Sequence, residues 1–441
     1  MSVFSTEDRP SAITLHHTHT HRFKTARLSL YTVLPADERL SPLVTLLYGI
    51  LRRGSESYPR LALLNQRLDE LYGTTLTIRN YLHGDRHVVC YTAEMLEADF
   101  LPPHDAHMDI LGGVMALLAD MILRPLRDES GCLRAEAVEK EKQSLTDSLR
   151  SLRNDTRAYS ATRLREIMCP QEPYGLSIGG TPEQVAKVTA EEVTACHQAL
   201  MESIRFEVFY TGRASEETVK SAFDKAFSGF APRLRPMPET TLHLPPEAPR
   251  FVSEDMPVGQ GKLCLGWACG ENYQTLKDPQ RLAAYAVCNE MFGVMQSSIL
   301  FRHVRERLGL CYFCDSALDM TKGILWVSCG IRPDRRAEAE AAICARLADV
   351  REGRISPEDV ELAKLSLLNS YRQIEDSQNS MESFAFCRLL NGTTDTPVEE
   401  MARIAAVTAE DVVAAAKTFV LDTVFFLNGT AEEGEEEEDD E

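Results

Sequence analysis

At 441 residues, the chain is longer than one hydrophobic core normally organises, so we expect two or more domains. Apolar residues make up 44% and charged residues 26% of the sequence, the proportions of a globular protein that folds in water. The formal net charge of −20 disfavours nucleic acid and anionic membrane surfaces as partners, and is compatible with basic peptides.

The N-terminal region contains acidic residues and no apolar segment of signal-peptide length, so we predict a cytoplasmic protein. Its 12 cysteines are scattered and should then be reduced thiols. Cys311-x-x-Cys314 lies in a β-type run without a second pair, which only weakly indicates a redox or zinc role. The longest apolar run, at 110–123, is shorter than a membrane span and contains Asp120, so it predicts a buried helix.

Histidines gather in LHHTHTH at 15–21, which reads as a strand. Side chains alternate along a strand, so His17, His19 and His21 would share one face. Three imidazoles on one face could bind a metal ion. A solvated strand face near a terminus is the other interpretation, and we favour it.

Two segments of the sequence repeat. KVTAEEVTACHQALMESIRFEVFYTGRASEE (187–217) and AVTAEDVVAAAKTFVLDTVFFLNGTAEEGEE (406–436) both open with V-T-A-E-[ED]-V and continue into an apolar strand. Thr189 and Thr408 are expected helix N-caps, because each is followed three residues later by an acidic side chain. The pattern indicates an internal duplication.

A proline-rich segment at 231–250 separates the repeats and is predicted to be an extended linker. Interleaved helices and alternating strands predict an α+β fold with two tandem homologous domains, 1–230 and 251–430. Each domain should contain a mostly antiparallel sheet packed with helices. Nine of the last ten residues are acidic, so we expect a disordered tail at 431–441.

The segment YLHGDRHVVCY at 81–91 spaces His83 and His87 as a zinc-binding helix would. In the repeat, however, His83-Gly84 aligns with Lys322-Gly323, at a predicted hairpin turn between two strands. Residues on a turn do not share a helix face, so we predict no metal site there.

Three longer motifs resemble a known family. LFRHVRERLGLCY (300–312) is similar to a signature in the C-terminal half of the pitrilysin/insulinase-type zinc peptidases, which include the mitochondrial processing peptidase. AVEKEKQSLTDSLRSLRND (137–155) and EPYGLSIGGTPEQVAKVTAEEV (172–193) resemble the N-terminal half of that family. The resemblance extends from about Phe23 to Gly429.

The resemblance implies a zinc site on a helix with an H-x-x-E-H motif, completed by a later glutamate. The matching helix here is LVTLLYGILRRGSESYP (43–59), which contains no histidine. In register, the two ligand positions fall on Thr45 and Gly49, the general-base position on Tyr48, and the later glutamate on Ser148 or Asp147. None of these residues replaces a zinc ligand set, so we predict no metal, no cofactor and no catalysis by this chain alone.

The resemblance also implies a substrate-contacting arginine followed seven residues later by a tyrosine. Arg305 and Tyr312 stand at that separation, and both side chains can donate to a developing oxyanion. In the alternative interpretation, Arg305 is a solvated helix residue and Tyr312 is a strand residue that packs on the core.

The pattern favours a non-catalytic subunit that binds extended peptides and pairs with a homologous zinc-bearing subunit in a heterodimeric metallopeptidase. Two alternatives remain open. One is an autonomous metallopeptidase that uses ligands such as His17, His19 and His21. The other is a stand-alone peptide-binding protein.

Overall fold

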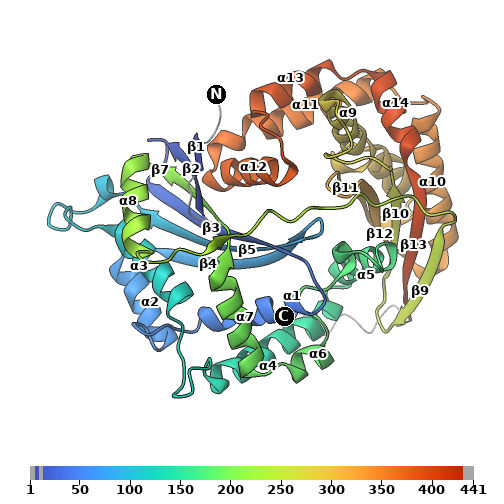
Figure 1. Cartoon of the computed structure of the whole chain (residues 1–441). Coiled ribbons are helices and arrows are strands. Elements are labelled where there is room, and N and C mark those ends of the chain that lie inside the picture. The colour runs from blue at the N-terminus through green and yellow to red at the C-terminus, as the bar shows by residue number, and fades with distance from the viewer. Residues whose placement is uncertain (1–4, 9–12, 431–441) are drawn as a thin grey trace. The chain divides into compact units, whose positions relative to one another are not determined.

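The structure is a computed structural model that describes residues 5–8 and 13–430 (Figure 1). The acidic tail expected at 431–441 lies outside the described residues. The chain divides into two compact units, each with its own sheet. Unit 1 takes in the described residues of Met1–Ser151, Leu176–Glu239 and Gln378–Ala385, and unit 2 those of Leu152–Gly175, Thr240–Ser377 and Phe386–Glu441.

Unit 1 is built on a sheet with the strand order β1-β2-β7-β3-β5-β4. Only β2 and β7 pair in parallel; the other neighbours are antiparallel. The strands are β1 (Ser5–Asp8), β2 (Ile13–His19), β3 (Thr25–Pro35), β4 (Thr75–His83), β5 (Arg86–Leu96) and β7 (Phe206–Gly212). A short parallel pair, β6 (Ser203–Ile204) with β8 (Arg233–Leu234), lies apart from this sheet.

Amphipathic helices supply the core of unit 1 together with the apolar face of the sheet. They are α1 (Leu40–Leu51), α2 (Leu61–Glu70), α3 (Ile110–Leu123), α4 (Ala135–Ser151), α6 (Pro182–Lys187), α7 (Ala190–Glu202) and α8 (Glu216–Ala226). The predicted buried helix at 110–123 is α3, and Asp120 is satisfied there by Ser57, whose hydroxyl donates at 3.0 Å. No helix in the described part of the chain is long and apolar enough to cross a membrane.

Unit 2 has a sheet with the order β11-β12-β10-β13-β9. Its strands are β9 (Arg250–Met256), β10 (Gly261–Ala268), β11 (Cys311–Asp319), β12 (Ile324–Ile331) and β13 (Val420–Gly429). Its helices are α5 (Thr156–Met168), α9 (Pro279–Asn289), the π-helical η4 (Glu290–Val294) and η5 (Phe301–Arg307), α10 (Arg336–Arg351), α11 (Pro357–Arg372), α13 (Pro397–Ala406) and α14 (Ala409–Thr418). The helix α12 (Gln378–Asn391) begins in unit 1 and ends in unit 2. Short 3₁₀ turns occur at η1 (Ala98–Phe100), η2 (Leu152–Asn154), η3 (Pro173–Gly175), η6 (Pro333–Arg335) and η7 (Ile374–Asp376).

The two sheets share one topology. The run β2-β7-β3-β5-β4 in unit 1 matches β9-β13-β10-β12-β11 in unit 2, and each contains one parallel pair at the same place. The helices that precede β7 and β13 both begin with the predicted capping box, at Thr189 with Glu192 and at Thr408 with Asp411. The α+β fold with two homologous, mostly antiparallel sheets is therefore confirmed. The hairpin prediction also holds, because β4 and β5 pair up to His83 and Arg86 around a loop opened by Gly84 at φ 58°.

The compact units differ from the expected halves 1–230 and 251–430. The helix α5, from the first half of the sequence, packs on β10 and β13 of unit 2, and the start of α12 belongs to unit 1. The linker at 231–250 lacks helices as expected, but it is bound to its neighbours rather than free. Arg235 donates to the carbonyl of Ser203 at 3.0 Å, and the backbone N–H of His243 donates to the carbonyl of Lys322 at 3.0 Å.

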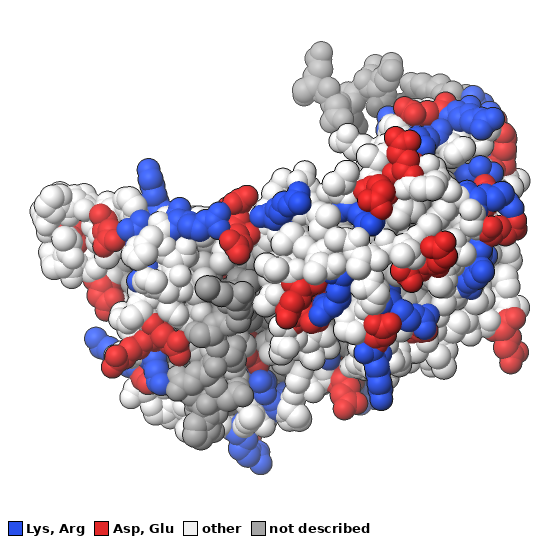
Figure 2. Space-filling view, turned by 90° about the horizontal axis from the view of Figure 1, so that it is seen from above, with Lys and Arg blue, Asp and Glu red and all other residues white. Residues whose placement is uncertain are grey.

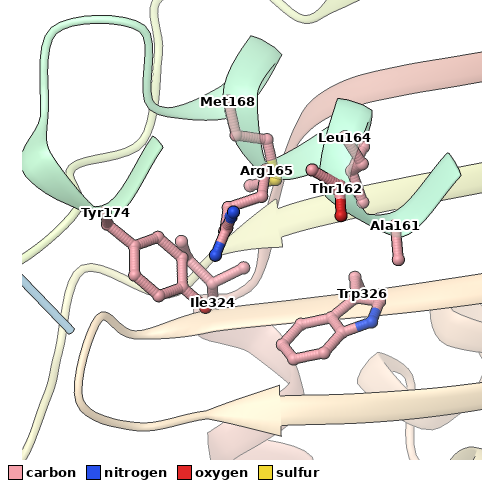
Figure 3. Close-up of a pocket in the computed structure, with 8 residues that line it drawn as sticks. All are labelled: Ala161, Thr162, Leu164, Arg165, Met168, Tyr174, Ile324 and Trp326. Carbon is pink, nitrogen blue, oxygen red and sulfur yellow. The ribbon is translucent and has the colours of Figure 1, made fainter. Parts of the chain in front are cut away.

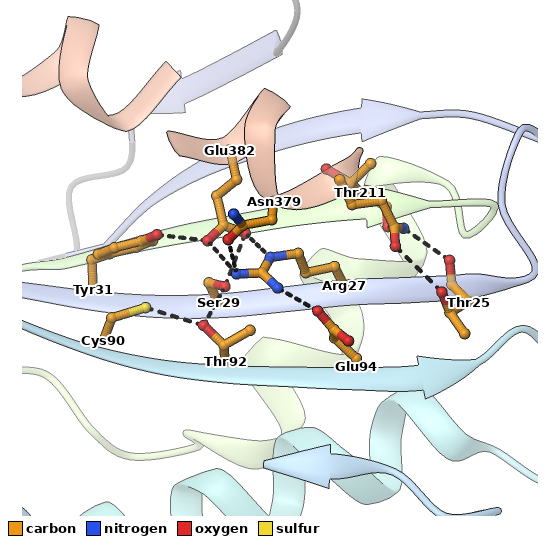
Figure 4. A network of polar contacts seen from close by, with 11 residues as sticks. Thr25, Arg27, Ser29, Tyr31, Cys90, Thr92, Glu94, Thr211, Asn379 and Glu382 are labelled. Carbon is orange, nitrogen blue, oxygen red and sulfur yellow. Dashed lines mark hydrogen bonds and ion pairs between the residues drawn. The ribbon is translucent and has the colours of Figure 1, made fainter. Parts of the chain in front are cut away.

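A buried carboxylate from α12 closes the polar face of β3 (Figure 4). Leu28 and Leu30 point into the core of unit 1, so Arg27, Ser29 and Tyr31 point to the opposite face. All three bind the carboxylate of Glu382: Arg27 Nε at 3.0 Å, Ser29 Oγ at 2.9 Å and the Tyr31 hydroxyl at 2.6 Å. Burial and the neighbouring carboxylate raise the pKa of Tyr31, so the hydroxyl stays a donor.

Replacement of Glu382 provides a test of this network. The side chains of Arg27 and Glu382 are 5% and 1% exposed, so Glu382→Ala removes the buried counter-charge of a buried guanidinium. We expect a loss of about 3–5 kcal/mol in the free energy of unfolding, measured by urea denaturation. Glu94→Ala is the matched control, because Glu94 pairs with the same guanidinium but is 51% exposed, and it should cost below about 1 kcal/mol. Equal effects of the two substitutions would contradict the role given to Glu382.

Candidate functional site

The helix α1 carries the first three positions at which the family resemblance implies a zinc site. Thr45 is half-buried; its hydroxyl donates to the carbonyl of Ile178 and accepts from Asn80 Nδ2, both at 2.8 Å. Tyr48 is 4% exposed, with its ring 5.5 Å from that of Tyr91. Burial raises the pKa of Tyr48 to about 12, so it remains a neutral phenol. Neither side chain can act as a zinc ligand or general base here.

The third position on α1, Gly49, lies against an acidic side chain from α4. A Cβ atom at Gly49 would overlap the carboxylate of Glu141. Arg53 holds that carboxylate from the end of α1, with Nη2 at 2.7 Å and Nε at 2.8 Å from Oε2. A guanidinium therefore supplies the positive charge beside this carboxylate.

The later glutamate position was expected at Ser148 or Asp147, but the side chain that meets Gly49 is that of Glu141, about two turns earlier on α4. Ser148 and Asp147 are exposed, and Asp147 accepts from Gln143 Nε2 at 2.9 Å. The placement of the later glutamate position at Ser148 or Asp147 stays a prediction, and Glu141 is a further acidic side chain of α4 that faces Gly49. Sequence reasoning missed Glu141, and the one feature that could have indicated it is its place in the motif at 137–155 that carries the resemblance.

The predicted pair Arg305 and Tyr312 lies on the surface of unit 2. Arg305 is exposed on η5, with its guanidinium carbon 4.9 Å from the centroid of the Phe301 ring. Tyr312 is 62% exposed near the start of β11, the edge strand. The π-helical geometry of η5 is of the rare kind that often marks functional sites. This exposure excludes the alternative in which the side chain of Tyr312 packs on the core.

A recess of about 220 Å³ lies between α5 and β12 in unit 2 (Figure 3). Side chains from the helix and the strand face each other across it, and the lining is largely apolar, with one guanidinium. It is formed by Ala161, Thr162, Leu164, Arg165, Met168, Tyr174, Ile324 and Trp326. Small-molecule and cofactor sites usually measure roughly 300–1,000 Å³, so this recess suits one apolar side chain better than a cofactor.

The histidines at the N-terminal strand do not converge as a ligand set. His17 is buried, stacks on Tyr210 and places Nε2 2.9 Å from the carbonyl of Ala214, so that nitrogen carries a proton. His19 and His21 are exposed and contact each other at 3.1 Å. Within the described residues, only two groups could hold a metal ion, and these histidines are in neither.

The first of those groups is Cys169, Glu172 and His243, and it already contains cations. His243 Nε2 lies 3.0 Å from Asp422, and Lys322 Nζ lies 2.7 Å from Glu172. Burial alone would lower the pKa of His243, but hydrogen bonds to Asp422, Cys169 and Glu172 raise it above its usual range. An imidazolium and an ammonium among these acids make a charge network, not a metal site. The second group is formed by Cys311, Cys314 and Cys329.

Comparison with known proteins places the chain among peptidase homologues. A family model described as the peptidase M16 inactive domain matches residues 187–367. The chain is 28% identical over 425 residues to a "probable inactive metalloprotease", YmfF, of Bacillus subtilis, covering 96% of this chain and 97% of that one.

Two solved structures are similar over nearly their whole length. A conserved protein of Enterococcus faecalis matches with a TM-score of 0.89 at 26% identity, covering 98% of this chain and all of that one. A peptidase M16 inactive domain from Pseudomonas fluorescens shares the fold, with a TM-score of 0.77 at 15% identity, covering 98% of this chain and 99% of that one. The chain is therefore similar over nearly its whole length to a probable inactive metalloprotease, its residues 187–367 match the peptidase M16 inactive domain, and its sequence contains no H-x-x-E-H motif.

Proposed function

We propose that this chain is the non-catalytic subunit of a two-subunit metallopeptidase. In this arrangement it binds the peptide substrate, and a homologous subunit that keeps H-x-x-E-H supplies the zinc. The observation that carries the proposal is a contrast within the chain. The expected ligand and general-base positions on α1 are buried, hydrogen-bonded or covered by a neighbouring side chain, whereas the predicted substrate-contact pair Arg305 and Tyr312 is exposed.

The electrostatics around α1 support a non-catalytic role. A catalytic zinc lowers the pKa of its bound water and thereby generates the attacking hydroxide. Here the positive charge beside Glu141 belongs to Arg53, which has no open coordination position and cannot be deprotonated at neutral pH. The pair can position α4 on α1, but it cannot activate water.

The surface around β11 supports peptide binding. An edge strand presents backbone N–H and C=O groups to which an extended peptide can add as a further strand. Apolar side chains on the adjoining π-helical region are unusually exposed, Val294 at 48% and Leu308 at 45%. The recess between α5 and β12 could take one apolar side chain of such a peptide.

Charge on the visible surface agrees with a peptide partner rather than nucleic acid. On the face shown in Figure 2, Lys and Arg are interspersed with Asp and Glu and do not gather into a basic stripe. Nucleic-acid binding depends on a concentrated basic footprint.

The substrate role of Arg305 and Tyr312 can be tested in the assembled enzyme. We expect no cleavage by this chain alone, and cleavage of an extended peptide when the zinc-bearing homologue is added. Arg305→Gln and Tyr312→Phe should each lower kcat by about 10²-fold, because each removes one donor to the developing oxyanion. Arg307→Gln, an exposed arginine on the same segment, is the control and should leave kcat unchanged. Cleavage by the chain alone would refute the proposal, as would equal losses in the three variants.

The placement of the degenerate zinc site can be tested by rebuilding it. Thr45→His with Gly49→His restores both imidazoles and keeps Tyr48, and the new side chain at 49 requires Glu141 to leave Arg53. We expect this double variant to gain one zinc per chain, measured by mass spectrometry of the metal content after dialysis. A further Glu141→Gln should abolish the gain, whereas Ser148→Ala should preserve it. Loss of the bound zinc in Ser148→Ala, with retention in Glu141→Gln, would instead support the predicted glutamate position at Ser148.

A further inference from the structure

Three cysteines from two neighbouring strands meet in unit 2. Cys311 and Cys314 lie on β11 and Cys329 lies on β12, and their Sγ atoms are all within 4.8 Å of one another. Cys314 is 6% and Cys329 1% exposed, while Cys311 is half-buried. The half-buried thiol gives the group a side open to ions from solvent.

A β-bulge is what brings these thiols together. In a regular strand, Cys311 and Cys314 would point to opposite faces, because they are three residues apart. Here Cys311 pairs with Ile331, Phe313 with Gly330 and Cys314 with Cys329, so Tyr312 is an extra residue in the ladder. Two ladder steps rather than three separate the cysteines, and both therefore face the side of Cys329.

We propose that Cys311, Cys314 and Cys329 form a binding site for one thiophilic d¹⁰ metal ion, Zn²⁺ or Cu⁺. A zinc–sulfur bond of about 2.3 Å in tetrahedral geometry places sulfur atoms about 3.8 Å apart, so a small contraction of the present group suffices. A set made only of sulfur ligands selects soft ions and rejects Mg²⁺ and Ca²⁺, which require oxygen ligands. With three sulfurs, Cu⁺ is trigonal, and Zn²⁺ keeps one position for water.

The three thiols interact with one another and with a nearby guanidinium. Hydrogen bonds from the Cys314 and Cys329 thiols lower the pKa of Cys311, and the charge of Arg305 lowers it further. The pKa values of Cys314 and Cys329 are raised by the same hydrogen bonds. The thiolate is the metal-binding form of cysteine, so binding of Zn²⁺ as a tris-thiolate of charge −1 would release protons to solvent. The positive charge of the Arg305 guanidinium would partly neutralise the negative charge of this complex.

Metal titration of the reduced full-length chain tests the site. Anaerobic protein would be titrated with Cd²⁺, a spectroscopic substitute for zinc, and the ultraviolet sulfur-to-cadmium charge-transfer band recorded. We expect saturation at one ion per chain. Cys311→Ser should weaken binding by at least about 10-fold, since losing a ligand costs no less than losing a partner of one. The half-buried Cys132 and Cys344 provide matched controls, and their serine variants should bind as the wild type does.

Two further measurements use the unmodified chain. Competition with a zinc-specific and a copper(I)-specific chelator identifies which ion is held more tightly. Bound ion should also protect Cys311 from alkylation by iodoacetamide, with no protection of Cys132. The absence of a charge-transfer band, a band unchanged in Cys311→Ser, or alkylation of Cys311 unaffected by metal would each overturn the proposal.

Discussion

The carboxylate of Glu382 is the interaction on which unit 1 most depends. The strand β3 alternates apolar and polar side chains, and its polar face must be satisfied by something other than water because Arg27 and Ser29 are almost fully buried. A helix from the C-terminal part of the chain provides that partner, and Gln378 on the same helix donates to the carbonyls of Thr25 and Thr211 at 2.8 and 2.9 Å. Without α12, the guanidinium of Arg27 would lose its buried counter-charge and keep the pairing with the half-exposed Glu94.

The reciprocal contribution comes from α5, which lies early in the sequence and covers the sheet of unit 2. Leu164 and Met168 from this helix share a buried cluster with Cys264, Phe425 and Leu427 of β10 and β13. Each unit thus needs a helix from the other half of the chain. A duplication that exchanges helices in this way gives two sheets of one topology that cannot be separated at the linker without exposing both. His243, within the linker, is 4% exposed and lies 3.0 Å from Asp422 of β13, so the linker is packed into unit 2 at this point.

Loss of catalysis and retention of the fold have the same physical origin. The zinc helix of this family is also a packing element, and α1 still buries Val44, Leu47 and Leu51. Arg53 neutralises Glu141, so the contact between α1 and α4 has a balanced charge. The thiol group on β11 and β12 lies in unit 2, so a metal ion bound there would be held by none of the residues at the expected zinc positions on α1. Metal content alone is therefore not a measure of peptidase function in this protein.

Local patterns in the sequence were enough to determine the α+β class, the internal repeat, the capping boxes at Thr189 and Thr408, and the absence of histidines from α1. Each of these features depends on the identity of a residue or on the spacing of residues close together in the chain. Folding changes neither the identities nor the spacings. Tertiary structure alone decided which side chain of α4 meets Gly49, namely Glu141. It also decided that α5 packs on the sheet of unit 2 and the start of α12 on the sheet of unit 1. The meeting of Cys329 with Cys311 and Cys314 was decided in the same way. The first depends on the segment between α1 and α4, and the second on which apolar faces of the helices pack. The third depends on one extra residue, Tyr312, in the pairing of β11 with β12. A side-chain contact between distant segments is set by the summed packing of the whole unit, and no short stretch of sequence contains that information.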